Sequence, residues 1–300
     1  MGTPEFAATI LDSLAKKYEV VLVVSQPDKE VGRKKVLTSP AVIEKAKELN
    51  LKYFQPKHIK DDYMPILNAG ADMIVTAAYG QIIPNEVLGC VKKAINVHAS
   101  LLPKHRGGAP IQRSIINGDK VTGISIIEMV SKLDAGVIYA KKEIEIEDSD
   151  NNTTLFEKLS YVGRDLLLDS ILDIYSGKNK GVPQDEDKVI YSPNIRREEE
   201  IITFNDSSIN IFNKIRGLAM EPGAYARIKG EDLKIYSSEI VEYNGNENPG
   251  TILSLKKEIV VKTKDSAIRL IDIKPSGKKM MKAKDFVNGQ KLLNVGDIFD

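Results

Sequence analysis

The chain has 300 residues with 43 basic and 42 acidic side chains, which gives a formal net charge of +1 at pH 7. This length can bury a substantial core and suits two domains, and no acidic or basic tail dominates the charge. No apolar run reaches the roughly 18 residues that a membrane-spanning helix needs, and the first residues lack the pattern of a secretory signal peptide.

Cys90 is the single cysteine, so the sequence excludes an intrachain disulfide and favours a reducing, cytoplasmic compartment. The apolar residues around Cys90 predict a small, buried side chain at this position. The three histidines are widely separated and, with one cysteine, do not indicate a metal site. We therefore expect a cytoplasmic protein with no membrane association and no bound metal.

Short apolar runs alternate with helical patterns in the first half of the chain. Thr3 and Pro4 predict a helix start, because a threonine hydroxyl can cap a helix and proline suits its first position. The alternation is typical of a parallel α/β sheet with crossover helices. The predicted helices are 3–18 and 40–49, and the predicted strands are 20–24, 73–77 and 94–98.

A strand should precede the first helix in a fold of this type, but the helix signal begins at residue 3. The missing strand would be central, and its absence would leave backbone groups of the neighbouring strands without partners. The explanations that stay open are a start assigned too late, a shortened chain, and a neighbouring segment that covers the gap.

Strands predicted at 122–129 and 137–146 flank a loop, and an amphipathic helix is predicted at 154–175. A polar stretch then separates this region from one with a different periodicity. There, a helix at 208–220 precedes short β runs between turn residues, which is typical of a small barrel. These runs are 224–228, 233–237, 250–255, 259–263 and 267–273.

Asn96 and His98 lie at the end of the strand predicted at 94–98. Because strand side chains alternate between faces, these two project from the same face. The Asn96 amide can donate to a developing oxyanion, and the His98 imidazole can take up a proton near neutral pH. Downstream, Asp134 can orient the ring and stabilise its charged form. The alternative is a pair of satisfied polar groups, and chemistry alone favours that alternative.

The run from Ser100 to Arg113 resembles the signature of the 10-formyltetrahydrofolate-dependent formyltransferases, and the run 132–136 resembles the segment that carries their aspartate. Further stretches place the resemblance in the branch of the family that formylates methionyl initiator tRNA. The resemblance extends from residue 1 to about residue 290. The further stretches are 1–7, 26–28, 78–84, 222–224 and 275–279.

The resemblance implies a Rossmann-like parallel-sheet catalytic domain at 1–178, a linker at 179–202, and an OB-like β-barrel domain at 203–300 that binds tRNA. It implies transfer of a formyl group from 10-formyltetrahydrofolate to the α-amino group of methionyl initiator tRNA, and we expect a monomer. One alternative is a folate-dependent formyltransferase that acts on glycinamide ribonucleotide or an amino sugar nucleotide. A non-catalytic RNA-binding relative is the other, although it would be expected to lose the catalytic residues.

The same resemblance assigns roles to individual residues. Asn96 would contact the oxyanion, His98 would handle the proton, and Asp134 would pair with His98 and set its tautomer. Folate contacts would come from the strand exit and from a second pocket wall, although a plain strand exit with core leucines is the alternative. The implied folate-contact residues are Ser100, Leu101, Leu102, Pro103, Tyr79 and Gly80.

The loop at 29–35 is basic and contains Gly32. A solvated loop would have the same composition. By resemblance, however, this loop inserts at the acceptor end of the tRNA, and Arg33 matches the arginine of the family at that place. Cationic side chains there would hold phosphates. The implied tRNA contacts are Arg33, Lys34, Lys35, Lys278 and Lys279.

Overall fold

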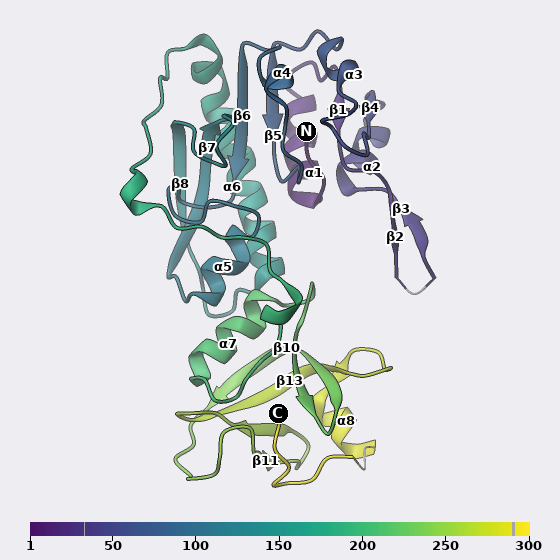
Figure 1. The fold of residues 1–300 in the computed structure, drawn as a ribbon, viewed down its shortest axis with the longest axis vertical. Coiled ribbons are helices and arrows are strands. Elements are labelled where there is room, and N and C mark those ends of the chain that lie inside the picture. Colours follow the sequence, from purple (N-terminus) through teal and green to yellow (C-terminus); the bar gives the residue numbers. More distant parts are fainter. Residues whose placement is uncertain (33, 290–291) are drawn as a thin grey trace. The chain divides into compact units, whose positions relative to one another are not determined.

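The computed structural model describes residues 1–32, 34–289 and 292–300 (Figure 1). Contacts divide the chain into two units. The first contains residues 1–110, 121–145 and 156–193, and the second contains residues 111–120, 146–155 and 194–300. Each unit has its own core of buried apolar side chains. Within the described residues, no helix has the length and apolar character that crossing a membrane requires.

A four-stranded sheet in the order β5–β6–β7–β8 forms the centre of the first unit. β5 (Met73–Thr76) and β6 (Lys93–His98) run parallel, whereas β7 (Val121–Glu128) is antiparallel to β6 and to β8 (Ile138–Glu145). The predicted α/β class is confirmed, although this sheet is mixed instead of wholly parallel. The connection between β7 and β8 explains one antiparallel pair, because it is too short for a crossover helix.

Helices α1 (Glu5–Ala15) and α6 (Asn152–Ser176) pack on one side of this sheet. The rings of Phe6 and Phe156 meet edge to face with centroids 5.6 Å apart. Gly163 of α6 lies so close to the sheet that a Cβ there would be 3.0 Å from Val97 Cγ1 of β6. The other helices of the unit are α2 (Ala41–Glu48), α3 (Met64–Leu67), α4 (Asn85–Leu88) and the 3-10 turn η1 (Glu186–Lys188).

Met1 and Gly2 lie between the four-stranded sheet and a separate parallel pair, β1 (Val23–Val24) and β4 (Tyr53–Phe54). On one side, the Gly2 N–H donates to the Val24 carbonyl at 2.9 Å. On the other side, the Met1 amine donates to the Val75 carbonyl at 2.7 Å, and the Ala77 N–H donates to the Met1 carbonyl at 2.9 Å. The first two residues therefore have the hydrogen bonds of a parallel strand between β1 and β5.

An apolar cavity of about 490 Å³ adjoins Met1 between β1 and β5. Its walls come from α1, β1, β5 and α6, and they include Leu14, Val23, Ile74 and Ile171. The cavity lies between the two strands where a central strand is expected, and Met1 lines it.

Two local predictions for the first unit are wrong. The Thr3 hydroxyl donates to the Tyr79 carbonyl at 3.0 Å and makes no capping bond, while Pro4 is the extended residue before a helix that begins at Glu5. Cys90 is exposed in the turn after α4, and its thiol donates to the Val87 carbonyl at 3.1 Å. The apolar neighbours of Cys90 suggested burial, but the turn directs Val87 inward and Cys90 outward.

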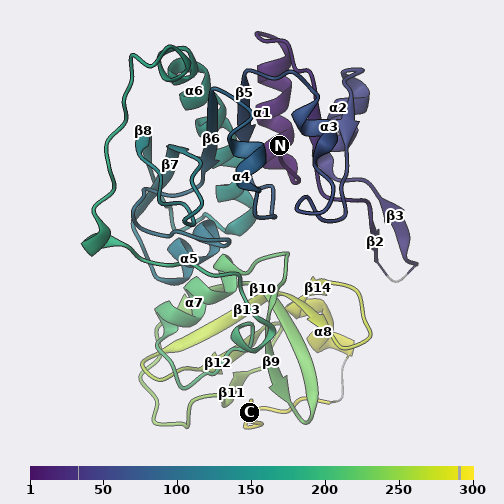
Figure 2. The same ribbon diagram turned by 45° about the horizontal axis from the view of Figure 1, so that its top comes forward.

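A hairpin that the sequence did not predict extends away from the rest of the first unit in both views (Figures 1 and 2). It consists of β2 (Lys29–Val31) and β3 (Val36–Thr38), and Gly32 at its turn has a φ of 72°. Its strands are fully exposed, which explains why no pattern of alternating apolar and polar residues announced them.

The second unit is built on an antiparallel sheet in the order β11–β12–β13–β10–β9, with β14 paired to β13. This half-barrel confirms the predicted OB-like domain. The strand β10 continues past residue 237, where the sequence predicted its end. A register shift around Ser237 interrupts the pairing with β13 there, and the strand resumes beyond it. The strands are β9 (Ala224–Ile228), β10 (Glu231–Val241), β11 (Ile252–Ser254), β12 (Ile259–Lys262), β13 (Ala267–Pro275) and β14 (Met281–Lys282).

The helices of the second unit include α7 (Ser208–Gly217), which begins at a Ser207 side chain that accepts the Asn210 N–H. The others are α5 (Pro110–Ile116), which the first unit shares at its first residue, the 3-10 turn η2 (Arg197–Glu199) and α8 (Ala283–Gly289).

The segment predicted as a linker at 179–202 has two parts. Residues up to 193 belong to the first unit, where Val182 exchanges backbone hydrogen bonds with Ile138 of β8 at 2.8 and 2.9 Å. Residues from 194 onward belong to the second unit.

Candidate active site

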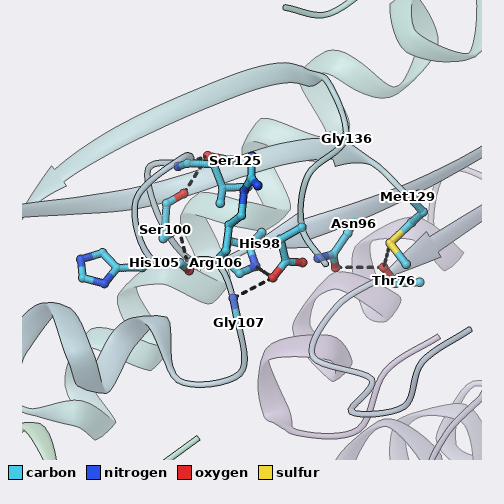
Figure 3. A network of polar contacts seen from close by, with 12 residues as sticks. Thr76, Asn96, His98, Ser100, His105, Arg106, Gly107, Ser125, Met129 and Gly136 are labelled. Atoms are coloured by element: carbon cyan, nitrogen blue, oxygen red, sulfur yellow. Dashed lines mark hydrogen bonds and ion pairs between the residues drawn. The ribbon is translucent and has the colours of Figure 1, made fainter. Parts of the chain in front are cut away.

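Asn96 and His98 stand side by side at the end of β6, as the strand period predicts (Figure 3). Thr76 pairs with Asn96 across β5 and β6, and its hydroxyl lies 2.9 Å from Asn96 Oδ1. Because a hydroxyl can donate to the amide oxygen, this contact orients the carboxamide. Figure 3 shows the amide nitrogen of Asn96 on the side that faces His98. The Asn96 NH₂ therefore lies on the His98 side of the carboxamide.

The tautomer of His98 follows from its backbone partner. Nε2 of the buried His98 ring lies 2.9 Å from the His105 carbonyl oxygen. A carbonyl oxygen accepts hydrogen bonds and cannot donate them, so Nε2 carries the proton. We expected Asp134 to set the tautomer, and that detail is wrong because the His105 carbonyl does so. Nδ1 is then the nitrogen that can exchange a proton with substrate.

Asp134 is held beside this nitrogen by the loop between β7 and β8. Its Oδ2 lies 3.7 Å from His98 Nδ1 and accepts the Gly107 N–H at 2.9 Å. Its φ of 47° is left-handed, a conformation that costs a residue with a side chain about 1 kcal/mol. The predicted trio is thus brought together in the first unit, with the carboxylate placed to stabilise a protonated ring.

The strand exit is more buried than a ligand-contact surface would be. Leu102 is fully buried and packs with Ile127 and Ile138. Ser100 is also fully buried, and its hydroxyl donates to the Lys104 carbonyl at 2.7 Å. The Leu102 side chain therefore belongs to the core, whereas Leu101 and Pro103 are partly exposed.

Tyr79 and Gly80 form the second predicted wall. Tyr79 is buried, and burial raises the pKa of its hydroxyl to about 12. Its carbonyl accepts hydrogen bonds from the Thr3 hydroxyl and from Gln26 Nε2. Gly80 has a φ of 84°, which favours glycine. A ligand could approach the backbone here, while the phenol ring belongs to the core.

Of the predicted tRNA contacts, Arg33 lies outside the described residues. Lys34 and Lys35 are exposed at the tip of the β2–β3 hairpin, where Lys35 lies 3.7 Å from Glu30. Lys278 and Lys279 are exposed in the turn between β13 and β14 of the second unit.

Two residues that hold the Asp134 loop were missed at the level of sequence. Arg106 is fully buried, although it lies in the run that carries the family resemblance. Gln184 donates from Nε2 to the backbone carbonyls of Asp134 and Gly136, at 2.7 and 2.8 Å. A glutamine in a polar stretch carries no local sequence signal of a role in the site. An arginine beside a glycine in a loop is only a weak signal of such a role.

Comparisons with known proteins show the family of this chain. Residues 1–171 match the formyl transferase family, and residues 194–291 match the formyl transferase C-terminal domain. The chain belongs to the formyl transferase family. This formyl transferase is 46% identical over 305 aligned positions to methionyl-tRNA formyltransferase of Streptococcus pneumoniae, covering 100% of this chain and 97% of that protein.

Solved structures share the fold of this formyl transferase at lower identity. The N-formyltransferase of Helicobacter canadensis, in complex with folinic acid and dTDP-3-aminofucose, is 18% identical with a TM-score of 0.69 over 90% of this chain and 96% of that one. Methionyl-tRNA formyltransferase of Clostridium thermocellum is 18% identical with a TM-score of 0.54 over 73% of this chain and 93% of that one. These similarities show that the fold is shared among formyltransferases.

Proposed function

We propose that this formyl transferase moves the formyl group of 10-formyltetrahydrofolate to the α-amino group of methionyl initiator tRNA. The observation that carries the chemistry is the meeting of Asn96, His98 and Asp134 at the end of β6. The choice of acceptor rests on the 46% identity, over the whole chain, to a methionyl-tRNA formyltransferase. The fold alone does not decide the acceptor, because a solved formyltransferase of similar fold was crystallised with an amino sugar nucleotide.

The first step is attack of the neutral methionyl amine on the formyl carbon. A C–N bond forms to the amine, and the formyl oxygen takes on negative charge. The NH₂ of Asn96, oriented through Thr76, donates to this oxygen. Such a donor accelerates acyl transfer because it meets charge that is absent in the ground state.

The second step is loss of the folate nitrogen. The attacking amine must lose a proton, and N10 must gain one as its bond to the formyl carbon breaks. Nδ1 of His98 is the ring nitrogen with a free lone pair, so it takes the amine proton and delivers it to N10. The Asp134 carboxylate stabilises the imidazolium while the ring holds this proton. The products are formylmethionyl-tRNA and tetrahydrofolate.

Substrate contacts complete the proposal. We assign folate binding to the backbone and exposed atoms around Leu101, Pro103 and Gly80. We assign tRNA phosphates to the basic hairpin and to the basic turn of the second unit, with that unit acting as the tRNA-binding domain. For this acceptor we infer a role in translation initiation in the cytoplasm.

One assay tests the function. Purified protein is mixed with 10-formyltetrahydrofolate and one of three acceptors, namely methionyl initiator tRNA, glycinamide ribonucleotide or an amino sugar nucleotide. Mass spectrometry of the amino acid released from the tRNA measures its formylation. The rate of formyl transfer to the tRNA is expected to exceed the rate of transfer to the small amines by orders of magnitude. Preferred transfer to a small amine would replace the proposed acceptor, and no transfer to any of them would remove the proposed activity.

A further inference from the structure

The backbone of Asp134 is held by a pair of side chains, Arg106 and Gln184, that does not touch the proposed reacting atoms. The guanidinium of Arg106 donates to Gln184 Oε1 from Nε at 3.0 Å and from Nη2 at 2.9 Å. The amide of Gln184 then donates from Nε2 to the Asp134 and Gly136 carbonyls. Because both ends of the amide are engaged, a flipped amide would put donors against donors and acceptors against acceptors.

Arg106 has no contact with water, and an arginine buried in this way is stable only when its donors are satisfied. Glu186 supplies the charge partner, with its Oε1 at 2.8 Å from Nη2. The backbone of Arg106 is fixed as well, since its N–H donates to the Ile190 carbonyl at 2.9 Å and its carbonyl accepts the Ser192 N–H at 2.7 Å. The arginine is therefore a rigid anchor in the first unit.

Arg106 is connected both to the backbone and to the side chain of Asp134. Through Gln184 it holds the Asp134 backbone carbonyl, and through the N–H of the next residue, Gly107, it holds the Asp134 carboxylate. Gly107 itself cannot take a side chain, because a Cβ there would lie 2.6 Å from the Ser192 carbonyl oxygen. These contacts hold Asp134 at its left-handed φ, which would otherwise relax toward a more common conformation.

We propose that Arg106 and Gln184 are positioning residues that keep the Asp134 carboxylate beside His98 Nδ1. The proposal rests on the catalytic roles given above to His98 and Asp134. Neither residue supplies a proton or a donor to the substrate. Their effect on formyl transfer runs through the backbone of the loop between β7 and β8.

Gln184→Glu separates this role from general stability. The substitution keeps the size of the side chain and an oxygen for Arg106, but it places a second oxygen against the Asp134 and Gly136 carbonyls. Asn179→Asp is the matched control, because the Asn179 amide donates to the Tyr139 carbonyl at 2.9 Å and accepts the Gly181 N–H at 2.9 Å. Both are partly exposed amides of the same unit, and only Gln184 contacts the Asp134 loop.

The expected result is a kcat for Gln184→Glu that is lower by about tenfold or more, with a KM for the folate donor changed by less than about threefold. In an Asp134→Asn background, Gln184→Glu should add less than about a twofold loss, because the two residues act through one contact. Equal losses in Gln184→Glu and Asn179→Asp, or losses that multiply in the double variant, would overturn the positioning role.

A spectroscopic measurement keeps this test independent of activity. The chain has three histidines, so histidine-selective ¹⁵N labelling gives a spectrum in which the His98 ring can be assigned by substitution. Gln184→Glu should shift the His98 ring resonances, and Asn179→Asp should leave them in place. If the protein formylates no acceptor but the shift is present, the proposed function fails and the positioning role stands. An unshifted His98 ring would reject the positioning role whatever the activity.

Discussion

His98 Nε2 and the His105 carbonyl oxygen lie 2.9 Å apart, and this single contact decides which nitrogen of the ring does the proton chemistry. In the neutral ring Nε2 carries hydrogen and Nδ1 carries the lone pair. Asp134 Oδ2 lies 3.7 Å from Nδ1, the nitrogen that exchanges the proton. The carboxylate therefore stabilises the charged ring, while the tautomer of the neutral ring is set by the His105 carbonyl.

The first prediction concerns this ring. ¹⁵N spectra of the histidine-labelled protein, at a pH where the ring is neutral, should show the hydrogen of His98 on Nε2. His98→Gln retains a donor for the His105 carbonyl but has no basic nitrogen, so single-turnover formyl transfer should fall by about 10²-fold or more. Asp134→Asn should also lower the rate. A neutral ring with its hydrogen on Nδ1 would contradict the assignment.

The second prediction concerns the orientation of Asn96. Asn96→Ala should lower kcat by roughly 10²- to 10³-fold, as loss of an oxyanion donor does elsewhere. Thr76→Val removes the hydroxyl that holds Asn96 Oδ1 and should cost about tenfold. Thr122→Val is the control, because the buried Thr122 hydroxyl has no hydrogen-bond partner within the described part of the chain. Equal rates for Thr76→Val and Thr122→Val would count against the orientation argument.

The third prediction concerns the Met1 amine. Burial lowers its pKa from 8.0 to about 5, so between these values the unfolded chain binds a proton that the folded chain lacks. The free energy of unfolding should therefore rise as pH rises from 5 to 8, by at most about 4 kcal/mol from this group. Thermal melts across this range check the direction.

Two N-terminal additions separate the amine from the cavity beside it. Placing about five Gly and Ser residues before Met1 converts the amine to an amide and should remove this part of the pH dependence. The same number of apolar, β-branched residues should also fill the cavity as a strand and raise the melting temperature, by about 2–4 °C for each 1 kcal/mol gained. Equal melting temperatures for the two additions would show that the cavity does not accept a strand.

The fourth prediction concerns acid stability. Hydrogen bonds from Arg106, and then from Lys132, lower the pKa of Glu186 to about 2. A carboxyl group with a depressed pKa stabilises the fold above its ordinary value of 4.5, and this contribution is lost as pH falls from there toward 2. Urea midpoints measured from pH 6 to pH 2.5 should decline less steeply for Glu186→Gln than for the unaltered protein. Parallel declines would show that the ion pair contributes nothing.

The fifth prediction concerns the basic hairpin. If Lys34 and Lys35 contact tRNA phosphates, the double alanine variant should bind methionyl initiator tRNA more weakly. The slope of log affinity against log salt should flatten by roughly 1 to 2. Changing the exposed pair Lys16 and Lys17, which follow the end of α1, to alanine removes the same charge and should leave the slope unchanged. Matching slopes in both double variants would mean that the hairpin acts through net charge alone.

Elements with a buried face were predictable from the sequence because burial imposes a periodic pattern. β6 and α2 follow this rule, and their bounds differ from the predicted ones by a single residue at some ends. The exposed β2–β3 hairpin has no inner face and gave no pattern. The sequence predicted that β10 ends at residue 237, whereas the strand continues beyond it. The register shift at Ser237 breaks the alternation of inward and outward side chains on which the prediction relied.

The candidate site was predictable where its residues are neighbours in sequence. Asn96 and His98 share a strand face, so their meeting follows from the period of the strand. The contacts between Arg106 and Gln184 join residues 78 positions apart, and those between Gln184 and Asp134 join residues 50 positions apart. No local rule predicts such pairs, because they depend on how the chain returns to the sheet.

The position of Gln184 determines how short a catalytic fragment can be. The family match over the first unit ends at residue 171, and the sequence predicts a domain end at residue 178. A fragment cut at either point keeps Asn96, His98 and Asp134 but lacks the glutamine that holds the Asp134 backbone and the glutamate that balances Arg106. Such a fragment would hold every reacting group and leave a buried arginine without its partners, so we expect formyl transfer to require the chain at least as far as Glu186.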